Sequence, residues 1–352
     1  MSLSRRSVFS EHIRKLLVDR EKNYLSPYAT LSSSSLGRAV QEVDYSGEFR
    51  LCFQRDRDRI IHSKPFRRLK GKTQVFLSPI GDHFRTRLTH TLEVSQISRT
   101  IARALALNED LAEAVALGHD LGHTPFGHFG ERALTNIVPG GFHHAKQSER
   151  ITQRMNLSLE VCNGIAKHSK GKGPILDDNI ERYAFTLEGQ IVRVADIIAY
   201  LNHDLDDASR AGMIKKEDIP LEISKVLGRT PKERLTVMVY DVIFSTSQSM
   251  KKDFNGGIKR IYMSSEVTEA MSELRTFLFK YVYEDSKIMA DYQRIYQICS
   301  EFFDYFSKNS EDLLRRMQRK ELYDSPDKVT VDYISGMTDK FAFDLYDQLF
   351  GG

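Results

Sequence analysis

The chain contains 352 residues, of which 41% are hydrophobic and 28% are charged. This balance is typical of a soluble globular protein with room for one large or two ordinary domains. The formal net charge of +3 is mild, so charge by itself does not predict nucleic-acid binding. No apolar run approaches the roughly 20 residues that a membrane-spanning helix needs.

Helical periodicity dominates the chain. Apolar residues recur close to every 3.6 positions in 91–107. The same pattern returns in five later segments, which are 110–121, 187–205, 267–283, 286–306 and 331–349. Alternating, strand-like runs are scarce, and 72–77 is one short candidate. We therefore expect an all-α protein with few or no strands.

Loop composition marks three stretches, which are the Ser-rich 29–37, 137–142 with its Pro-Gly-Gly, and the Gly- and Pro-containing 170–174. The histidines concentrate before Asp204, and the C-terminal third contains none. We therefore expect an N-terminal extension over 1–40 and a catalytic region over 41–215. A helical C-terminal region over 216–352 is expected to pack on that catalytic core.

Cysteine usage and the N-terminus indicate where the protein works. Cys52, Cys162 and Cys299 lie far apart, show no Cys-x-x-Cys spacing and are odd in number. They are typical of the reduced thiols of a cytosolic protein, and they argue against a structural zinc site built from cysteines. The first residues are not followed by the apolar stretch of a signal peptide, so we expect a cytoplasmic protein.

One segment of fourteen residues carries an unusual density of reactive side chains. His119, Asp120, His123, His128 and Glu131 lie in it, among glycines and apolar side chains. All five can bind a metal or transfer a proton, and a surface helix has no reason to hold so many of them beside Leu and Phe. The pattern predicts a buried or cleft-lining polar site, most simply a metal site with an acid/base group beside it.

Four residues are candidate metal ligands. His119 and Asp120 are neighbours, and both can bind one ion that sits near the end of their helix. His90 lies at the start of a strongly amphipathic helix, and Asp196 is the only acid in an otherwise apolar helical segment. Because an unpaired buried carboxylate is costly, Asp196 needs a partner, and a metal is such a partner. Two histidines and two aspartates suit Mn²⁺, Fe²⁺, Zn²⁺ or, less ideally, Mg²⁺.

The order His…His-Asp…Asp resembles the signature of the HD phosphohydrolase superfamily. A chain of blocks also resembles, in order, bacterial deoxynucleoside triphosphate triphosphohydrolases, the dGTPase-like proteins. These blocks are 66–75, 87–94, 119–131, 144–148, 194–200, 202–208 and 332–339. The resemblance covers most of 40–210 and one patch near 332–342, and it implies an HD-domain helical fold with additional C-terminal helices.

The resemblance implies hydrolysis of a deoxynucleoside triphosphate, such as dGTP, to a deoxynucleoside and inorganic triphosphate, with water attacking the α-phosphorus. It implies a divalent metal cofactor (Mn, Mg, Fe or Zn) held by His90, His119, Asp120 and Asp196. It also implies a homo-oligomer, because relatives assemble symmetrically, and some relatives respond to an allosteric dNTP or to single-stranded DNA. A basic groove is the electrostatic requirement for nucleic-acid binding of that kind.

His128 and Glu131 resemble the catalytic pair of the family. An imidazole titrates near neutral pH and can give a proton to the leaving 5′-oxygen or take one from water, and both assignments stay open. A carboxylate three residues away can fix the tautomer of that imidazole and raise its pKa.

The resemblance further implies a substrate pocket. His123 lies on the phosphate side, and Arg87 contacts the phosphate or the base. Tyr200 and Asp204 share a helical face and contact the sugar, and Gln74 reaches the 3′-hydroxyl. An aromatic ring against C2′ would exclude a ribose 2′-hydroxyl and so select deoxynucleotides.

Other functions fit parts of this pattern. His119 and His123 have the i,i+4 spacing of a zinc-protease helix, but Asp120 replaces the glutamate base of that motif, and glycines and a proline end the helix. Another HD phosphohydrolase, acting on nucleoside monophosphates, cyclic nucleotides or alarmones, is an alternative. A catalytically silent nucleotide- or nucleic-acid-binding regulator is a further one.

Two features outside the ligand set have two interpretations each. The charged run at 55–59 is either a solvated, self-paired surface or a phosphate or subunit contact. His143 and His144 are either loop histidines or functional groups, and Lys146 departs from the residue that many relatives have in this block.

Overall fold

The computed structural model describes residues 3–42, 48–75, 77, 84–169, 171, 173–252 and 260–351. Within these ranges the secondary structure is helical, with no strand and two isolated β-bridges, Arg38 with Ser158 and Thr73 with Thr86. The predicted all-α fold is confirmed, and the described part of the candidate strand 72–77 contributes only the bridge at Thr73. No helix of the described chain is both long and apolar enough to cross a membrane.

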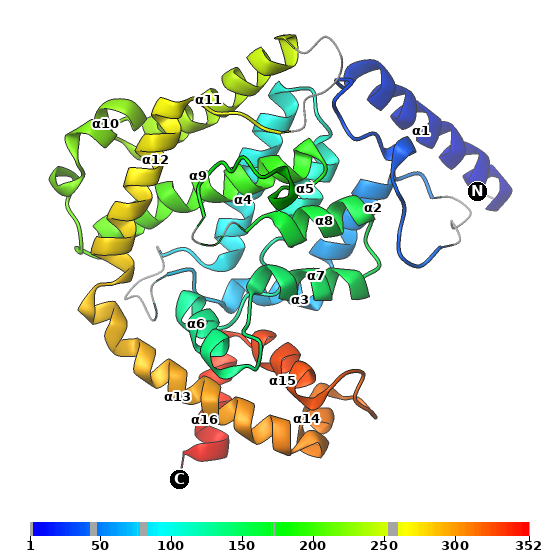
Figure 1. Cartoon of the computed structure of the whole chain (residues 1–352). Helices are drawn as coiled ribbons and strands as arrows, with labels where there is room; N and C mark the ends of the chain where they lie inside the picture. Colours follow the sequence, from blue (N-terminus) through cyan, green and yellow to red (C-terminus); the bar gives the residue numbers. More distant parts are fainter. Residues whose placement is uncertain are drawn as a thin grey trace.

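The helices up to residue 210 are α1 (Leu3–Tyr24), α2 (Cys52–Ile61), α3 (Lys64–Arg68), α4 (Arg87–Ala104), α5 (Glu109–Gly118), α6 (Gly127–Ile137), α7 (His144–Arg154), α8 (Leu159–Lys167) and α9 (Leu187–Arg210). The later ones are α10 (Leu221–Leu227), α11 (Pro231–Lys252), α12 (Ser265–Leu278), α13 (Ser286–Lys308), α14 (Ser310–Met317), α15 (Pro326–Ser335) and α16 (Asp339–Phe350). Figure 1 shows α4, α5 and α9 at the centre, with α1 at one edge and α13 to α16 at the bottom.

Buried apolar side chains form two clusters. The larger cluster is built on α4, α5 and α9, which contact one another, and it continues into α10, α11 and α12. The smaller cluster joins α6 to α13, α15 and α16. Each fully buried aliphatic or aromatic side chain stabilises the fold by about 1.5–3 kcal/mol relative to exposure. The helices that carry the predicted ligands are therefore held by the larger of the two buried clusters. The division of the chain into three regions stays a prediction.

The start of α4 fixes the position of His90. The side chain of Thr86 accepts from the backbone nitrogen of Thr89, and the Thr89 hydroxyl accepts from the backbone nitrogen of Thr86 at 3.0 Å. This reciprocal capping starts the helix at Arg87. Arg87 and His90 are three residues apart, so they lie on one face of the first turn.

A turn separates α5 from α6, where the sequence predicts that glycines and a proline end the helix. α5 ends at Gly118, and α6 begins at Gly127, directly after Phe126 in the left-handed region with a φ of 64°. Gly122 lies so close to the backbone of Ser148 that a Cβ at this position would collide with it. The turn therefore holds Asp120 and His123 outside regular helix, whereas His128 and Glu131 lie on α6.

Candidate metal and substrate site

The predicted metal ligands come together where three helices meet. His90 lies on α4, His119 and Asp120 follow the end of α5, and Asp196 lies on α9. The Nε2 atoms of His90 and His119 are 3.3 Å apart. The Oδ1 of Asp196 lies 3.1 Å from the His90 Nε2 and 3.9 Å from the His119 Nε2, and the Oδ2 of Asp120 lies 3.8 Å from the latter. We call these four residues the HD site.

The HD site fits a divalent ion. Ligand atoms that bind one ion at about 2.0–2.2 Å lie about 3 Å or slightly more from one another, close to the separations found here. The Nδ1 of His119 lies 2.6 Å from the carbonyl oxygen of Ala116, and the Nδ1 of His90 lies 2.8 Å from the Nε2 of His203. Such contacts orient each ring and leave its Nε2 lone pair for a metal.

His203 links the HD site to Asp204. The Nδ1 of His203 lies 2.7 Å from the Oδ1 of Asp204, and the Tyr283 hydroxyl donates to the Oδ2 of Asp204 at 2.5 Å. Burial by itself would raise the pKa of Asp204, but the charge of His203 and these hydrogen bonds outweigh it, so the pKa is lowered. Asp204, a predicted sugar contact, is thus connected through His203 to His90, a predicted metal ligand.

Arg87 forms a buried ion pair with the HD site. Its Nη1 lies 2.6 Å from the Oδ2 of Asp120, and each side chain is at most 4% exposed. Burial alone would raise the pKa of Asp120, but the Arg87 guanidinium together with the charges of the neighbouring histidines outweighs it and holds the pKa well below its usual value. The Nε and Nη2 of Arg87 have no hydrogen-bond partner among the described residues. Because buried unpaired donors are costly, these atoms are suited to an anionic ligand.

Glu131 is hydrogen-bonded to His144 and not to its predicted partner His128. Its Oε1 accepts from the backbone nitrogen of His144 at 2.9 Å and lies 2.7 Å from the Nδ1 of that residue. Burial by itself would lower the pKa of His144, but the charge and the hydrogen bond of Glu131, together with the charge of Asp120, outweigh it, so that the pKa is raised. His128 is exposed on the first turn of α6, and His123, His128 and Glu131 offer ligand atoms within 4.8 Å of one another. His128 and Glu131 therefore lie close together, but the carboxylate of Glu131 is hydrogen-bonded to His144.

His168 connects the two groups of side chains. It follows the end of α8, and its Nε2 lies 3.1 Å from the Nε2 of His144. Its Nδ1 lies 2.6 Å from the carbonyl oxygen of Ile165, and its ring centroid lies 5.1 Å from that of His119. Burial lowers the pKa of His168 to about 3, so the ring is neutral at physiological pH.

The remaining predicted substrate residues lie around these groups. Tyr200 lies one turn after Asp196 on α9 and is half-buried. Gln74 is buried, and neither its Oε1 nor the Nε2 of His123 has a hydrogen-bond partner in the described chain. Lys72 is also buried, and its Nζ donates to the carbonyl oxygens of His123 and Ser335 at 2.5 and 2.7 Å.

The C-terminal patch at 332–342 contacts α7, the helix that begins at His144. Asp332 on α15 accepts hydrogen bonds from three side chains of α7, namely Gln147 at 2.7 Å, Arg150 at 3.0 Å and Arg154 at 2.7 Å. These bonds fix α7, whose first residue is His144. This patch, which is part of the family resemblance, therefore stabilises the position of His144 without contacting the HD site itself through these bonds.

Sequence reasoning gave no individual role to four residues of this region, which are Lys72, His168, His203 and Tyr283. His168 directly follows an apolar helical segment that ends at residue 167, and His203 directly precedes Asp204, so both carried a local signal. Tyr283 lies in a π-helical turn 79 residues after Asp204, and only the fold brings the two together.

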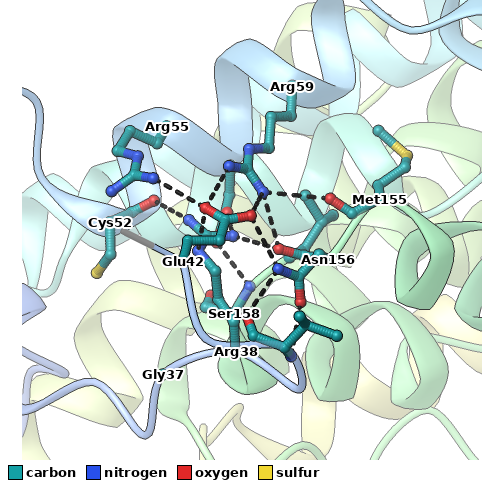
Figure 2. Close-up of polar contacts among 12 residues, drawn as sticks. Gly37, Arg38, Glu42, Cys52, Arg55, Arg59, Met155, Asn156 and Ser158 are labelled. Carbon is teal, nitrogen blue, oxygen red and sulfur yellow. Dashed lines mark hydrogen bonds and ion pairs between the residues drawn. The ribbon is translucent and has the colours of Figure 1, made fainter. Parts of the chain in front are cut away.

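The charged run at 55–59 is paired within the chain. Glu42 binds Arg55 at 2.9 Å and Arg59 at 2.5 Å, and it accepts from Asn156 at 2.8 Å. Arg38 forms an ion pair with the buried Asp56. Figure 2 shows how Glu42 and Arg38 of the N-terminal segment reach α2 and the connection between α7 and α8. These contacts fasten the N-terminal segment to the helical core.

Comparison with known proteins places this geometry in a family. The HD domain matches residues 87–201, which contain the whole HD site, and the phosphohydrolase-associated domain matches 261–348. A deoxyguanosinetriphosphate triphosphohydrolase-like protein of Desulfatibacillum aliphaticivorans is 46% identical, over 96% of this chain and 98% of its own length.

A protein of the same description from Caldanaerobacter subterraneus subsp. tengcongensis is 47% identical over 96% of each chain. A solved phosphohydrolase structure from Bacteroides thetaiotaomicron matches with 16% identity and a TM-score of 0.47, covering 83% of this chain and 69% of that one. The chain therefore belongs to the HD phosphohydrolases, in the family of deoxyguanosinetriphosphate triphosphohydrolase-like proteins.

Proposed function

We propose that this protein hydrolyses deoxynucleoside triphosphates to a deoxynucleoside and inorganic triphosphate. The observation that carries the proposal is a pair of buried donors without hydrogen-bond partners beside the HD site, the Nε and Nη2 of Arg87. A triphosphate supplies the anionic oxygens that such donors bind most strongly. The names of these two relatives support the choice of substrate.

The proposed cofactor is a divalent ion held by the HD site. When bound, such an ion polarises a phosphate oxygen and lowers the pKa of a water molecule. Two imidazoles among the four ligands favour Mn²⁺, Fe²⁺ or Zn²⁺, whereas Mg²⁺ prefers oxygen ligands. Arg87 keeps the carboxylate of Asp120 in position and directs its free nitrogens toward the phosphates.

In the proposed reaction, the oxygen of water bonds to the α-phosphorus, and the bond between that phosphorus and the 5′-oxygen breaks. The attacking water gives up one proton, and the 5′-oxygen takes one and leaves as the hydroxyl of the deoxynucleoside. We assign the proton transfer to His128, because its ring is exposed and reaches the vicinity of His123 and Glu131. Glu131 contributes negative charge there and fixes the ring of His144.

The proposed sugar contacts are Tyr200 and Gln74. The buried Oε1 of Gln74 lacks a partner and can accept from a 3′-hydroxyl. The ring of Tyr200 against C2′ would leave no room for a ribose 2′-hydroxyl. Both oxygens of Asp204 are bonded, one to His203 and one to Tyr283, so we assign Asp204 to holding these two rings.

A product assay tests the proposal. The full chain is incubated with each dNTP and with Mn²⁺ or Mg²⁺, singly and in mixtures, in water enriched in ¹⁸O. Deoxynucleoside and triphosphate are expected, with the label on the triphosphate because water attacks the α-phosphorus. Pyrophosphate or orthophosphate as the product, or no turnover in every mixture, would refute the proposal.

The mixtures also address regulation and assembly. We propose that the chain forms a homo-oligomer, and that a second dNTP or single-stranded DNA stimulates it. Turnover of one dNTP is expected to rise when another dNTP or an oligodeoxynucleotide is added, and light scattering during the same titration reports the mass of the assembly.

A further inference from the structure

The ammonium of Lys72 is buried near the HD site, and the proposed reaction gives it no role. Lys72 is 1% exposed. Its Nζ donates to the carbonyl oxygen of His123 at 2.5 Å and to that of Ser335 at 2.7 Å. These two acceptors lie 51 and 263 residues further along the chain. Because a lysine is almost never fully buried unless its charge is paired, its place in the interior needs a reason.

The main chain of Lys72 holds the start of α4. Its carbonyl oxygen accepts from the backbone nitrogen of Arg87 at 3.0 Å. The next residue, Thr73, forms the isolated β-bridge with Thr86, the residue that caps α4. Lys72 and Thr73 therefore fix the position of Arg87, whose Nε and Nη2 are the proposed phosphate donors.

The side chain of Lys72 holds the turn that carries His123. The backbone nitrogen of His123 donates to the carbonyl oxygen of Asp120 at 3.0 Å, and its own carbonyl oxygen accepts from Lys72. Both ends of the main chain of His123 are therefore fixed, and they set the direction in which its imidazole points. The family resemblance puts His123 on the phosphate side of the pocket. Lys72 thus connects the two residues to which the resemblance gives phosphate contacts, Arg87 and His123.

The positive charge of Lys72 is only partly compensated by its surroundings. Burial is the largest influence, and it lowers the pKa of Lys72 to about 7. The charges of Arg87 and Arg68 act in the same direction, whereas those of Asp339 and Asp120 oppose it. An opposite charge nearby favours the charged form of a buried amine. A ligand with several negative charges beside Arg87 would therefore stabilise the ammonium.

We propose that Lys72 is a positioning residue for the triphosphate, which fixes Arg87 through its main chain and His123 through its ammonium so that both reach the phosphates together. The buried charge of Lys72 adds to the attraction for the anion. The proposal rests on the proposed function, because it concerns the same phosphate pocket. The competing explanation is that Lys72 only fastens the turn at His123 to the end of α15 and so stabilises the fold.

Binding of inorganic triphosphate tests the proposal with the full chain in excess Mn²⁺. Lys72→Met has a side chain of similar length without the ammonium, and it keeps the main-chain bond to Arg87. Calorimetry is expected to show a Kd for triphosphate that is raised by about 10–100-fold, as for the loss of a buried charged hydrogen-bond partner. The Kd for deoxyguanosine, which carries no phosphate, should not change.

A double-mutant cycle shows whether Lys72 acts through His123. His123→Ala removes the imidazole, so adding Lys72→Met to it should cost less triphosphate affinity than Lys72→Met costs in the unmodified protein. Lys64→Met, at an exposed lysine on α3, controls for the loss of one positive charge and should leave the Kd unchanged. Competition with a chelator for Mn²⁺ confirms that the HD site is intact in each variant.

Equal losses of affinity for triphosphate and for deoxyguanosine, or no loss for either, would overturn the proposal and leave Lys72 a residue of the fold alone. Circular dichroism confirms folding, and Lys72→Gln, which keeps a neutral donor, replaces Lys72→Met if the latter unfolds. The readout is binding, so an absence of dNTP hydrolysis by a protein that binds triphosphate would refute the proposed function without affecting this result. An unmodified protein that binds no triphosphate would overturn both.

Discussion

Asp339 on α16 accepts hydrogen bonds from the two loops that flank the site. Its Oδ1 accepts from the backbone nitrogen of Phe126 at 2.8 Å, and its Oδ2 accepts from the backbone nitrogen of Thr73 at 3.0 Å. Phe126 has a φ of 64° and directly precedes α6, so the carboxylate fixes the turn from which His128 extends. A C-terminal side chain thus determines the geometry of a loop 213 residues earlier.

Asp339→Ala is expected to lower the free energy of unfolding by about 1–3 kcal/mol, because two backbone donors lose a charged acceptor. Denaturant unfolding measures the loss. Asp344→Ala on the same helix is the control, since Asp344 forms only an exposed pair with Lys340 among the described residues. Equal, negligible losses in the two variants would show that Asp339 does not hold the turn.

Local periodicity was sufficient to predict the helices of the site but not their cross-contacts. The 3.6-residue spacing of apolar residues in 91–107 and 187–205 predicts α4 and α9, because one face of each must be buried. The contact between Asp339 and Phe126 depends on how distant helices pack, and no local pattern encodes it. The same holds for His144, which binds the carboxylate that the family resemblance assigned to His128.

Asp204→Asn is expected to weaken metal binding by about 10–100-fold, although Asp204 is not itself in the HD site. Asparagine removes the charge that holds His203, and His203 orients His90 through its Nε2. Competition with a fluorescent chelator measures the affinity for Mn²⁺.

The control for this experiment is Asp206→Asn, because Asp206 lies on the same helix and pairs outward with Arg85 and Arg210. If Asp204→Asn leaves metal affinity intact and raises only the KM for the dNTP, then Asp204 serves the sugar and the relay through His203 is unimportant.

Glu42→Gln is expected to destabilise the protein by about 1–2 kcal/mol at pH 7, with the value reduced for partial solvent screening. The hydrogen bond from Arg59 lowers the pKa of Glu42 from 4.5 to about 2 (Figure 2). A carboxylate whose pKa is lowered on folding stabilises the protein above its unfolded pKa. That stabilisation is lost as the pH falls from about 4.5 toward 2.

The difference in unfolding free energy between Glu42→Gln and the unmodified protein should therefore shrink across this acidic range. Glu222→Gln, at an exposed position paired with Lys225, provides the baseline. If this difference in unfolding free energy does not change with pH, then Glu42 stabilises the protein through packing and not through its charge.

His128→Ala is expected to reduce kcat for dNTP hydrolysis by about 10²–10⁴-fold, the usual contribution of a proton-transfer group. The bound metal should not change, because His128 is outside the HD site. Steady-state kinetics and metal analysis on the same sample check both statements. His12→Ala, an exposed histidine on α1, controls for loss of any imidazole. Full activity in His128→Ala would show that another group transfers the proton. His144, which is bound to Glu131, would then be the first candidate to test.

Tyr200→Ala is expected to reduce the preference for dGTP over GTP by about 10–200-fold, measured as the ratio of the two kcat/KM values. The aromatic ring excludes the ribose 2′-hydroxyl by its volume, so removing the ring should raise turnover of GTP more than it lowers turnover of dGTP. Tyr200→Phe keeps the ring and loses only the hydroxyl, so it should retain the preference. Loss of selectivity in Tyr200→Phe as well would show that discrimination depends on a hydrogen bond from the hydroxyl and not on steric exclusion.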